Sequence, residues 1–292
     1  MKITLRQLEV FATIASHGHV TRAAEAVALT QSATSMALAD LERQLDARLF
    51  DRVGRQLLLN EAGRQLLPRA LEVLDRVREI EATARGGETA FDLHLGASLT
   101  IGNHLLPQLM AELGRRHPQG RIRISLHNTE QVLADLLAFR IDLGFVEGPV
   151  QDPRLRRFPW RTDRLQVFSA PSHPLAGKTA TPADLQAAPW ILREKGSGTR
   201  EVFDRALSNA TLTPRVSLEL KQPEAIRQCV RADLGLGCLS RLELQDAFQA
   251  GWLAPVEAPF LNLGRDFQVV THADKHLSSG LLTVLSLCGI SI

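Results

Sequence analysis

The sequence predicts an α/β protein in which an all-α-rich amino-terminal part precedes a larger part built on a sheet. Up to Arg85, apolar residues recur at helical spacing and Pro68 is the only proline. From Phe91 onward, short apolar runs alternate with helical stretches, which is typical of βαβ units and a largely parallel sheet. The change falls at residues 83–89, where two adjacent glycines indicate a domain hinge.

Composition places the chain among globular proteins of ordinary charge. Its 292 residues are enough for about two domains, and a formal net charge of +2 points to no nucleic-acid partner by itself. No apolar run approaches the roughly 18 residues of a membrane span, and the start lacks a signal-peptide pattern. Three cysteines, an odd number, favour a reducing compartment over a disulfide framework. We therefore expect a cytoplasmic protein with no membrane partner.

The first 45 residues predict three short helices. One covers about residues 5–16, a second about 22–29 with Thr21 as its cap, and a third continues from a tight connection at 30–32 to about 45. The third helix has an inward face with 4-3-4 spacing, at Thr34, Leu38, Leu41 and Leu45. Two short helices joined by a three-residue turn indicate a helix-turn-helix, whose second helix can enter a major groove. A plain helical hairpin fits the spacing alone equally well.

The residues after the third helix predict a small β-hairpin wing. Arg52 and Arg55 flank Val-Gly, and guanidinium groups at such a tip can meet phosphates or a narrow minor groove. From Leu5 to about residue 60, the chain resembles the winged helix-turn-helix of LysR-type transcriptional regulators. The segments that carry the resemblance are Leu5-Arg6-Gln7-Leu8-Glu9-Val10-Phe11, Thr21-Arg22-Ala23-Ala24-Glu25, Thr30-Gln31-Ser32, Leu41-Glu42-Arg43-Gln44-Leu45 and Arg48-Leu49-Phe50-Asp51-Arg52.

The resemblance implies promoter DNA as a partner, and RNA polymerase as another if the protein is an activator. The expected DNA contacts are the start and outward face of the third helix and the wing: Thr30, Gln31, Ser32, Ala33, Ser35, Met36, Arg52 and Arg55. Gln31 alone suits a bidentate base contact, preferring adenine. Many relatives carry an arginine where this chain has Met36. Seven basic and six acidic side chains within residues 1–60 leave the domain weakly charged, so it should depend on two-fold avidity and on its wing.

A long linker helix should follow, with Asn60 as its cap where the family more often has threonine. Its apolar residues form a heptad seam at Leu66, Ala70, Val73, Val77, Ile80 and Ala84, widened by Leu67, Leu71 and Leu74. So broad an apolar face favours a homodimer, or a homotetramer built as a dimer of dimers, over a helix that lies on its own domain. Two readers related by a two-fold axis would match an inverted-repeat site.

The remaining residues resemble the family's effector domain, a two-lobed, Rossmann-like fold of the type 2 periplasmic-binding-protein kind. The resemblance divides the chain into 1–59, 60–86 and 87–292, with lobe I at 91–162 and 266–292 and lobe II at 163–265. Ligands in open α/β sheets lie beyond the carboxyl ends of strands, where helices begin. Hydroxyls, an amide and a glycine cluster at three such places: Ser98, Thr100, Asn128, Thr129, Ser197, Gly198 and Thr199.

One such cluster could be a simple helix cap, but three that converge indicate an anion site. The effector should therefore be a small carboxylate or oxyanion. Arg200 either adds charge to that site or faces solvent.

Three alternatives compete with an effector-controlled regulator. Cys229 and Cys238, on a helix and the turn after it, could form a redox sensor, although buried inert thiols are the simpler interpretation. An exported solute-binding protein is disfavoured because the sequence shows no export signal. An enzyme is disfavoured because Gly196-Ser197-Gly198 is no nucleophile elbow, and the His and Cys spacing predicts no metal. We expect no catalytic residue, no cofactor and no metal.

Overall fold

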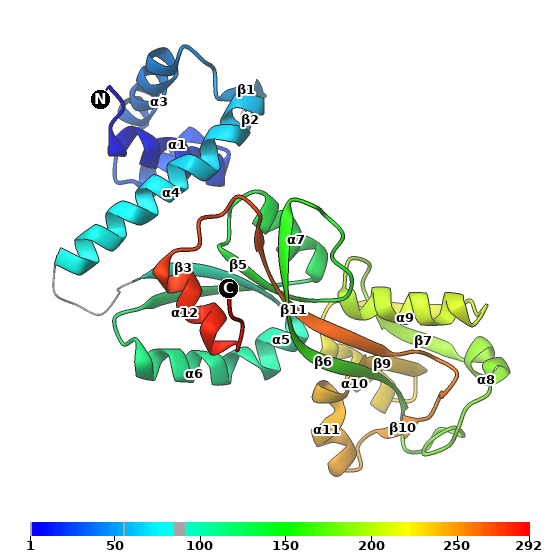
Figure 1. The fold of residues 1–292 in the computed structure, drawn as a ribbon. Helices are drawn as coiled ribbons and strands as arrows, with labels where there is room; N and C mark the ends of the chain where they lie inside the picture. Colours follow the sequence, from blue (N-terminus) through cyan, green and yellow to red (C-terminus); the bar gives the residue numbers. More distant parts are fainter. Residues whose placement is uncertain (1, 55, 85–90) are drawn as a thin grey trace.

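The structure is a computed structural model that describes residues 2–54, 56–84 and 91–292. A helical amino-terminal domain, a long helix and a two-lobed α/β part follow one another along the chain (Figure 1). The hinge predicted at residues 83–89 lies largely outside the described residues.

The amino-terminal domain is the predicted winged helix-turn-helix. A capping box of Thr4 and Gln7 starts the first helix, and Gly18 ends it in the left-handed conformation that favours glycine, with φ 70°. The two wing strands pair antiparallel. Its elements are α1 (Leu5–His17), α2 (Val20–Ala26), α3 (Gln31–Leu45), β1 (Phe50–Val53) and β2 (Gln56–Leu59).

The start and end of the second helix differ from expectation. α2 begins at Val20 with His19 as its N-cap, so Thr21 is not the cap. The helix stops after Ala26 because Ala28 turns left-handed, with φ 52°, and the chain closes with a bond from the Leu29 N–H to the Ala24 carbonyl of 2.9 Å. The turn thus precedes Thr30, which caps α3 instead of belonging to the turn.

The linker helix α4 (Glu61–Ala84) starts as predicted, because the Asn60 side chain accepts a bond from the Gly63 N–H. One stripe of α4 packs into the core of the amino-terminal domain through Leu67, Ala70 and Leu74. Of the predicted seam, Ala70 therefore belongs to the intradomain face, whereas Val73 and Ile80 are 41% and 67% exposed.

Lobe I is a parallel sheet covered on both faces. β4, β3 and β5 lie side by side in that order. α5, α6 and α12 contribute to the core on one face and α7 to that on the other. The elements are β3 (Asp92–Ser98), α5 (Leu99–His104), α6 (Leu106–Arg116), β4 (Arg121–His127), α7 (Thr129–Leu137), β5 (Leu143–Glu147) and α12 (Ser279–Leu287).

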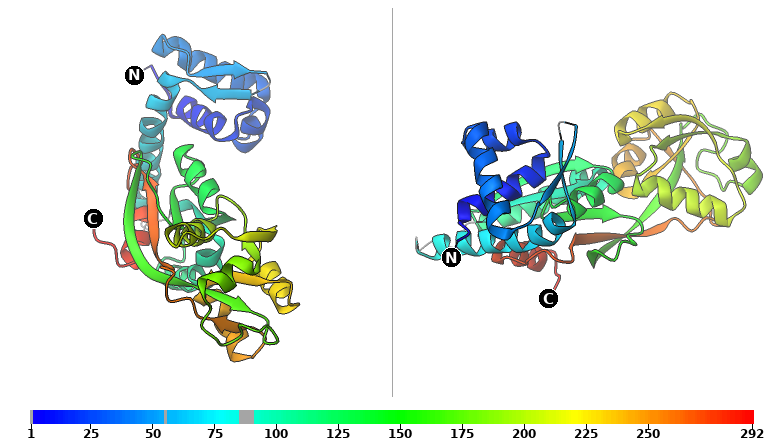
Figure 2. Two further views of the ribbon diagram at one scale, coloured as in Figure 1. Left: turned by 90° about the vertical axis from the view of Figure 1, so that its right-hand side faces the viewer. Right: turned by 90° about the horizontal axis from the view of Figure 1, so that it is seen from above.

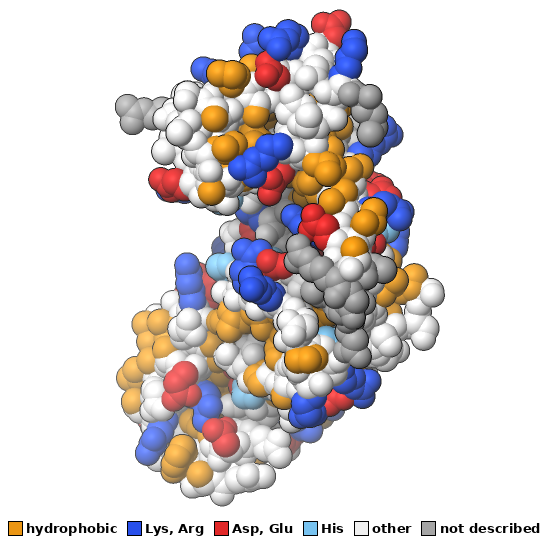
Figure 3. Space-filling view, turned by 90° about the vertical axis from the view of Figure 1, so that its left-hand side faces the viewer, with side chains coloured by type: hydrophobic (Ala, Val, Ile, Leu, Met, Phe, Trp, Pro, Cys, Tyr) orange, Lys and Arg blue, Asp and Glu red, His pale blue; other side chains and the backbone are white. Residues whose placement is uncertain are grey.

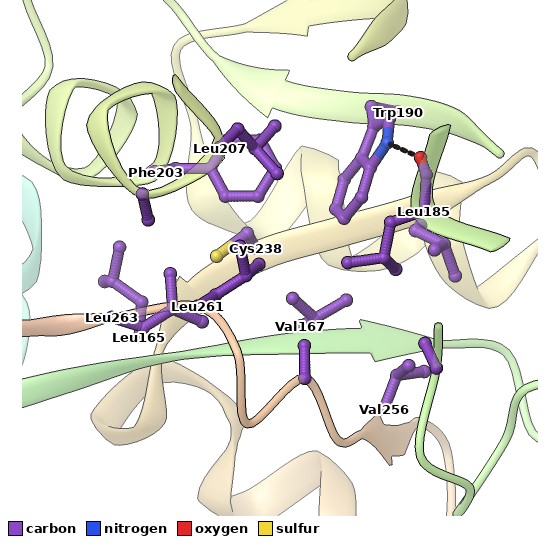
Figure 4. Close-up of a cluster of buried hydrophobic side chains, with 14 of the residues drawn as sticks. Leu165, Val167, Leu185, Trp190, Phe203, Leu207, Cys238, Val256, Leu261 and Leu263 are labelled. Atoms are coloured by element: carbon purple, nitrogen blue, oxygen red, sulfur yellow. Dashed lines mark hydrogen bonds between the residues drawn. The ribbon is translucent and has the colours of Figure 1, made fainter. Parts of the chain in front are cut away.

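Lobe II repeats the arrangement with β9, β7 and β8 parallel to one another. Trp190, Phe203 and Cys238 lie together in its core (Figure 4), where the indole N–H of Trp190 donates to the Leu185 carbonyl at 3.0 Å. The elements are α8 (Pro182–Ala187), β7 (Pro189–Arg193), α9 (Gly198–Asn209), β8 (Arg215–Leu220), α10 (Pro223–Arg231), β9 (Leu236–Ser240), α11 (Arg241–Gln249) and β10 (Ala254–Val256).

Two long strands, β6 (Leu155–Ser169) and β11 (Gly264–His272), join the lobes and run antiparallel to each other (Figures 1 and 2). The expectation of a largely parallel sheet is therefore only partly correct, since β6 and β11 pair antiparallel with their neighbours. β6 begins ten residues before Leu165, where its buried apolar run starts. Apart from Leu155, its earlier part is exposed or half-buried, and it carries Arg156, Arg157, Arg161 and Arg164, so no apolar run marks it in the sequence.

The linker helix also contacts lobe I of its own chain. Lys275, 7% exposed, places its Nζ 3.2 Å from an Asp75 oxygen on α4 and 2.9 Å from an Asp142 oxygen on lobe I. Nearby, a Glu79 oxygen accepts a bond from the Ser279 N–H at the start of α12. Figure 3, seen from the side of α4, shows the amino-terminal domain as a head set on the rest of the molecule.

Candidate functional site

The outward face of α3 carries most of the residues predicted to contact DNA. Gln31, Ser32, Ser35 and Met36 are exposed, and Ala33 is half-buried. Thr30 instead caps the helix, since its hydroxyl oxygen accepts a bond from the Ala33 N–H at 3.2 Å. The opposite face is buried as predicted, by the side chains of Thr34, Leu38 and Leu41, with Leu45 partly buried. The spacing therefore separated the inner face of α3 from its outer face correctly.

The wing lies beside this outward face. Arg52 of β1 is exposed and lines, with Gln31 and Ser35, a hollow of about 380 Å³ between α3 and the wing. Within the described part of the chain Arg52 makes no ion pair, whereas Arg43 pairs with Asp40. Arg55 lies outside the described residues. The hollow thus carries an amide and a cation, two groups whose chemistry suits base edges and phosphates.

The three predicted polar clusters of the effector part meet at Glu147, the last residue of β5. The Ser98 hydroxyl donates to the Glu147 carboxylate, and the Thr129 hydroxyl donates to the Glu147 carbonyl at 3.1 Å. Gly198 lies against the same residue, where a Cβ would come within 2.1 Å of the Glu147 carbonyl oxygen. Only glycine fits there, because the start of α9 in lobe II lies directly against the end of β5 in lobe I.

Two of the other predicted residues have different partners. Asn128 caps α7, because its side-chain oxygen accepts a bond from the Gln131 N–H at 3.0 Å. Arg200 neither faces solvent nor enters the cleft, since its guanidinium binds Asp204, Glu219 and the Arg193 carbonyl.

Arg265, the last residue of the range predicted for lobe II, lies between the lobes. Its Nε is 2.7 Å from an Asp163 oxygen, and one Nη donates to the Thr199 hydroxyl at 2.8 Å. The same Nη is 3.5 Å from a Glu147 oxygen, with both side chains 1% exposed. Arg265 therefore connects β5, β6 and the start of α9.

Several buried polar atoms around this point lack a hydrogen-bond partner among the described residues. Arg193 binds the Glu194 carboxylate through Nε and one Nη, which leaves its Nη1 unpartnered. The second Nη of Arg265 and the hydroxyl of Ser197 are likewise unpartnered. Ser197 precedes α9 but its side chain makes no capping bond. Unsatisfied buried donors are costly, and a bound ligand is one way to satisfy them.

Glu243 of α11 completes the set with two carboxylate oxygens that lack a partner within the described chain. Burial raises the pKa of this carboxyl to about 7, while the Thr100 hydroxyl beside it and the Arg193 charge lower the pKa. Thr100, a predicted effector residue, is thus buried at Glu243. We call the group of buried polar residues formed by Arg193, Ser197, Glu243 and Arg265, where the two lobes meet, the interlobe cleft.

The cysteines are not arranged as a redox pair. Cys238 lies on β9, not on a turn, and in the lobe II core (Figure 4), and burial raises the pKa of its thiol far above the ordinary value. Cys229 packs against a different core cluster, beside Ile226 and Leu244. A thiol that stays protonated and buried is a poor nucleophile.

Within the described ranges, no three His, Cys, Asp or Glu side chains gather as metal ligands. Likewise, no helix of residues 2–54, 56–84 and 91–292 is both long and apolar enough to cross a membrane.

Sequence reasoning missed the charged residues of the cleft, although some carried a signal. Glu147 and Arg193 each end a buried apolar strand, and a charge at that position of a parallel sheet points toward a ligand site. Glu243 had no such signal, since an acidic residue in the first turn of a helix is ordinary.

Comparison with known proteins agrees with both halves of the structure. Residues 5–64 match the model of the bacterial regulatory helix-turn-helix protein, lysR family, and residues 86–289 match that of the LysR substrate binding domain. The chain is 46% identical over 288 residues to the uncharacterized HTH-type transcriptional regulator YeiE of Escherichia coli K12, covering 99% of this chain and 98% of that one.

Two solved structures are similar in fold. A full-length OxyR variant from Pseudomonas aeruginosa superposes with a TM-score of 0.75 at 22% identity, covering 99% of this chain and 95% of that one. The Synechocystis CcmR regulatory domain, solved in complex with 2-PG, gives 0.63 at 28% identity and covers 68% of this chain and 95% of that one.

Proposed function

Because this chain belongs to the LysR family of transcriptional regulators, we propose that its interlobe cleft binds a small anion and that this anion controls its action at promoter DNA. The observation that carries the proposal is the pair of buried arginines, Arg193 and Arg265, each with an unpartnered N–H. The protein acts as a regulator and not as an enzyme, and its place of action is the cytoplasm.

The unpartnered donors of the cleft, and not its net charge, support an anion. The carboxylates of Glu147, Asp163 and Glu194 already have hydrogen-bond or ion-pair partners, so they do not call for a cation. The donors left over are guanidinium N–H groups and one hydroxyl, which suit carboxylate or inorganic oxyanion oxygens. The 2-PG complex of the CcmR regulatory domain supports a ligand of this class in this fold.

The amino-terminal domain would read DNA through α3 and the wing. Gln31 would contact an adenine edge, Met36 a thymine methyl, and Arg52 a phosphate or the minor groove. Arg55 stays a prediction for the wing tip. The other assigned contacts, Ser32, Ala33 and Ser35, lie on the exposed or half-buried side of the same helix.

Pairing of two copies through the linker helix would give a dimer whose two DNA-binding domains recognise an inverted-repeat site. α4 has three stripes. One faces the core of the amino-terminal domain, and a second, at Asp75 and Glu79, contacts lobe I. The seam around Val73, Val77 and Ile80 is separate from both. A helix can therefore pair with a second copy while it stays on its own lobe. We propose the boundaries 1–59, 60–86 and 87–292, a dimer or tetramer as the working state, and polymerase contact if the protein activates.

The test is binding of small anions to the full-length protein. A thermal-shift panel of carboxylates and inorganic oxyanions should contain ligands that raise the melting temperature, because a ligand that binds only the folded state stabilises it. Arg193→Gln should weaken such a ligand, and Arg205→Gln, which changes an exposed arginine on α9, should not. A panel in which only cations or apolar compounds stabilise the protein would refute the proposal. A gel shift with promoter DNA, with and without the ligand, then tests whether the ligand changes DNA binding.

A further inference from the structure

Glu243 is the one carboxylate of the interlobe cleft that has no ion-pair partner among the described residues. It lies in the first turn of α11, is 2% exposed, and has two carboxylate oxygens without a hydrogen-bond partner among the described residues. The charges of Arg193 and Arg265 are close enough to lower its pKa and that of Glu147 to raise it, but burial has the largest effect. No ion pair joins Glu243 to a described cation.

The elements packed against α11 supply Glu243 with one nearby hydroxyl but with no charged partner. That hydroxyl is Thr100 of α5, which is close enough to Glu243 to lower its pKa, and α5 also carries His104, whose pKa burial lowers. β6 contributes Asp163, which is bound to Arg265 and to the Ser240 hydroxyl at the end of β9. Arg227 of α10 pairs with Asp246 at the exposed side of α11. Glu243 therefore remains the unpartnered acceptor of the cleft.

The same cleft thus offers unpartnered donors and an unpartnered acceptor. An anion that carries its own O–H or N–H can place its charged oxygens on Arg193, Arg265 and Ser197 and donate its hydrogen to the Glu243 carboxylate. An anion without such a hydrogen leaves the buried carboxylate unpaired and adds a like charge beside it. A ligand that lacks the matching donor leaves a buried acceptor of the site unpaired and therefore binds more weakly than a ligand that has it.

We propose that Glu243 is a specificity-determining residue that selects an anion bearing its own hydrogen-bond donor and admits a fully deprotonated anion only after the Glu243 carboxyl has taken up a proton from solvent. This inference rests on the proposed anion site, but it adds a requirement that an anion site by itself would not have.

Inorganic phosphate and sulfate are matched probes, because both are tetrahedral oxyanions but only phosphate keeps an O–H between pH 6 and pH 8. Calorimetry on the full-length protein should show sulfate binding about tenfold more weakly at pH 8 than at pH 6, the factor expected when one carboxyl with a pKa of about 7 must be protonated. Phosphate should change by less than about threefold over the same range, since it supplies the donor itself.

Two variants assign the effect to this carboxyl rather than to His104 or another titrating group. In Glu243→Gln the side-chain amide offers a donor at every pH, so sulfate should bind equally at pH 6 and pH 8. Glu224→Gln is the matched control, since Glu224 is also an acidic residue in the first turn of a lobe II helix but is 61% exposed. This control should keep the tenfold change for sulfate.

The outcomes separate the two proposals. If both anions bind the unaltered protein with affinities that do not depend on pH, the anion site stands and the role of Glu243 is wrong. A tenfold change that persists in Glu243→Gln also refutes that role. If neither phosphate nor sulfate binds at pH 6, the anion site fails and this inference fails with it.

Discussion

Replacing Lys275 by methionine should separate the linker helix from lobe I. The Lys275 ammonium lies between Asp142 of lobe I and Asp75 of α4, at 2.9 Å and 3.2 Å. Burial lowers the pKa of Lys275, but the two carboxylates raise it by more, so the net shift is upward and the group is charged at neutral pH. Methionine has a similar length but no charge, and it leaves two carboxylates facing each other, of which Asp75 keeps an ion pair with Arg78 at 2.9 Å.

The magnitude follows from how deeply the cluster is buried. Removing one partner of a fully buried ion pair costs about 3–5 kcal/mol, because the remaining charge is uncompensated. Here the carboxylate side chains are 15% and 24% exposed, so water relieves part of that penalty. We expect a loss of about 2 kcal/mol in the free energy of unfolding.

A double-mutant cycle on the full-length protein measures the contact directly. Urea unfolding of Lys275→Met, Asp75→Asn and the double variant should give a coupling energy of about 1–2 kcal/mol, because the second change removes one of the stranded charges. Lys178→Met, at an exposed lysine of lobe II, is the control and should be neutral. A Lys275→Met protein as stable as this control, or a cycle that sums to zero, would show that the ion cluster does not hold the helix.

The remaining predictions concern DNA binding, assembly and pH. Arg52→Ala should weaken binding to all DNA sequences alike and flatten the salt dependence of binding by about one unit. Gln31→Ala should instead relax the base preference at one position per half-site, at a cost of about 1–3 kcal/mol. Gel shifts on variant DNA sites distinguish the two, and equal sequence specificity in both variants would contradict the assignment. Val73→Asp with Ile80→Asp should give smaller species in sedimentation with the fold retained, because both side chains are exposed within one chain, and an unchanged oligomer would exclude the seam. For Glu243, a folded pKa raised from 4.5 to about 7 means that the folded state binds more protons than the unfolded state between these values, so stability is greatest below pH 4.5 and falls as pH rises to 7. Glu243→Gln should remove this fall and raise the free energy of unfolding by up to about 3 kcal/mol at pH 8 without effector. If the free energy of unfolding falls equally with pH in the variant and in the unaltered protein, the prediction is wrong.

The parts of the structure that the sequence predicts well are those determined by local spacing. The inner face of α3, at Leu38 and Leu41, follows from periodicity alone, and the Asn60 cap follows from the chemistry of one residue and its neighbours. The second helix was wrong at both ends: it begins at Val20, so Thr21 is not its cap, and a left-handed Ala28 ends it early, a conformation that no local rule favours at alanine.

The cleft was predictable only in part, for a different reason. Ser98, Thr129 and Gly198 were identified because strand ends in such a sheet converge. The charges that give the cleft its chemistry depend on pairings across the chain, as between Arg265 and Thr199, or between Arg265 and Asp163. Such pairings exist only after the lobes have assembled, so spacing along the sequence carries no record of them.

The paired strands β6 and β11 restrict the mechanics of effector control. Backbone hydrogen bonds run between them from Leu155 to Arg164, and the register shifts once, near Phe267 and Gln268. Sliding one strand along the other would break this ladder, whereas bending or twisting the ribbon as a unit preserves it. The joint therefore leaves the lobes rotational freedom but little translational freedom. A ligand held between the lobes can therefore act on the linker helix by rotating one lobe relative to the other. The hydrogen-bonded ribbon of β6 and β11 is the axis of that rotation.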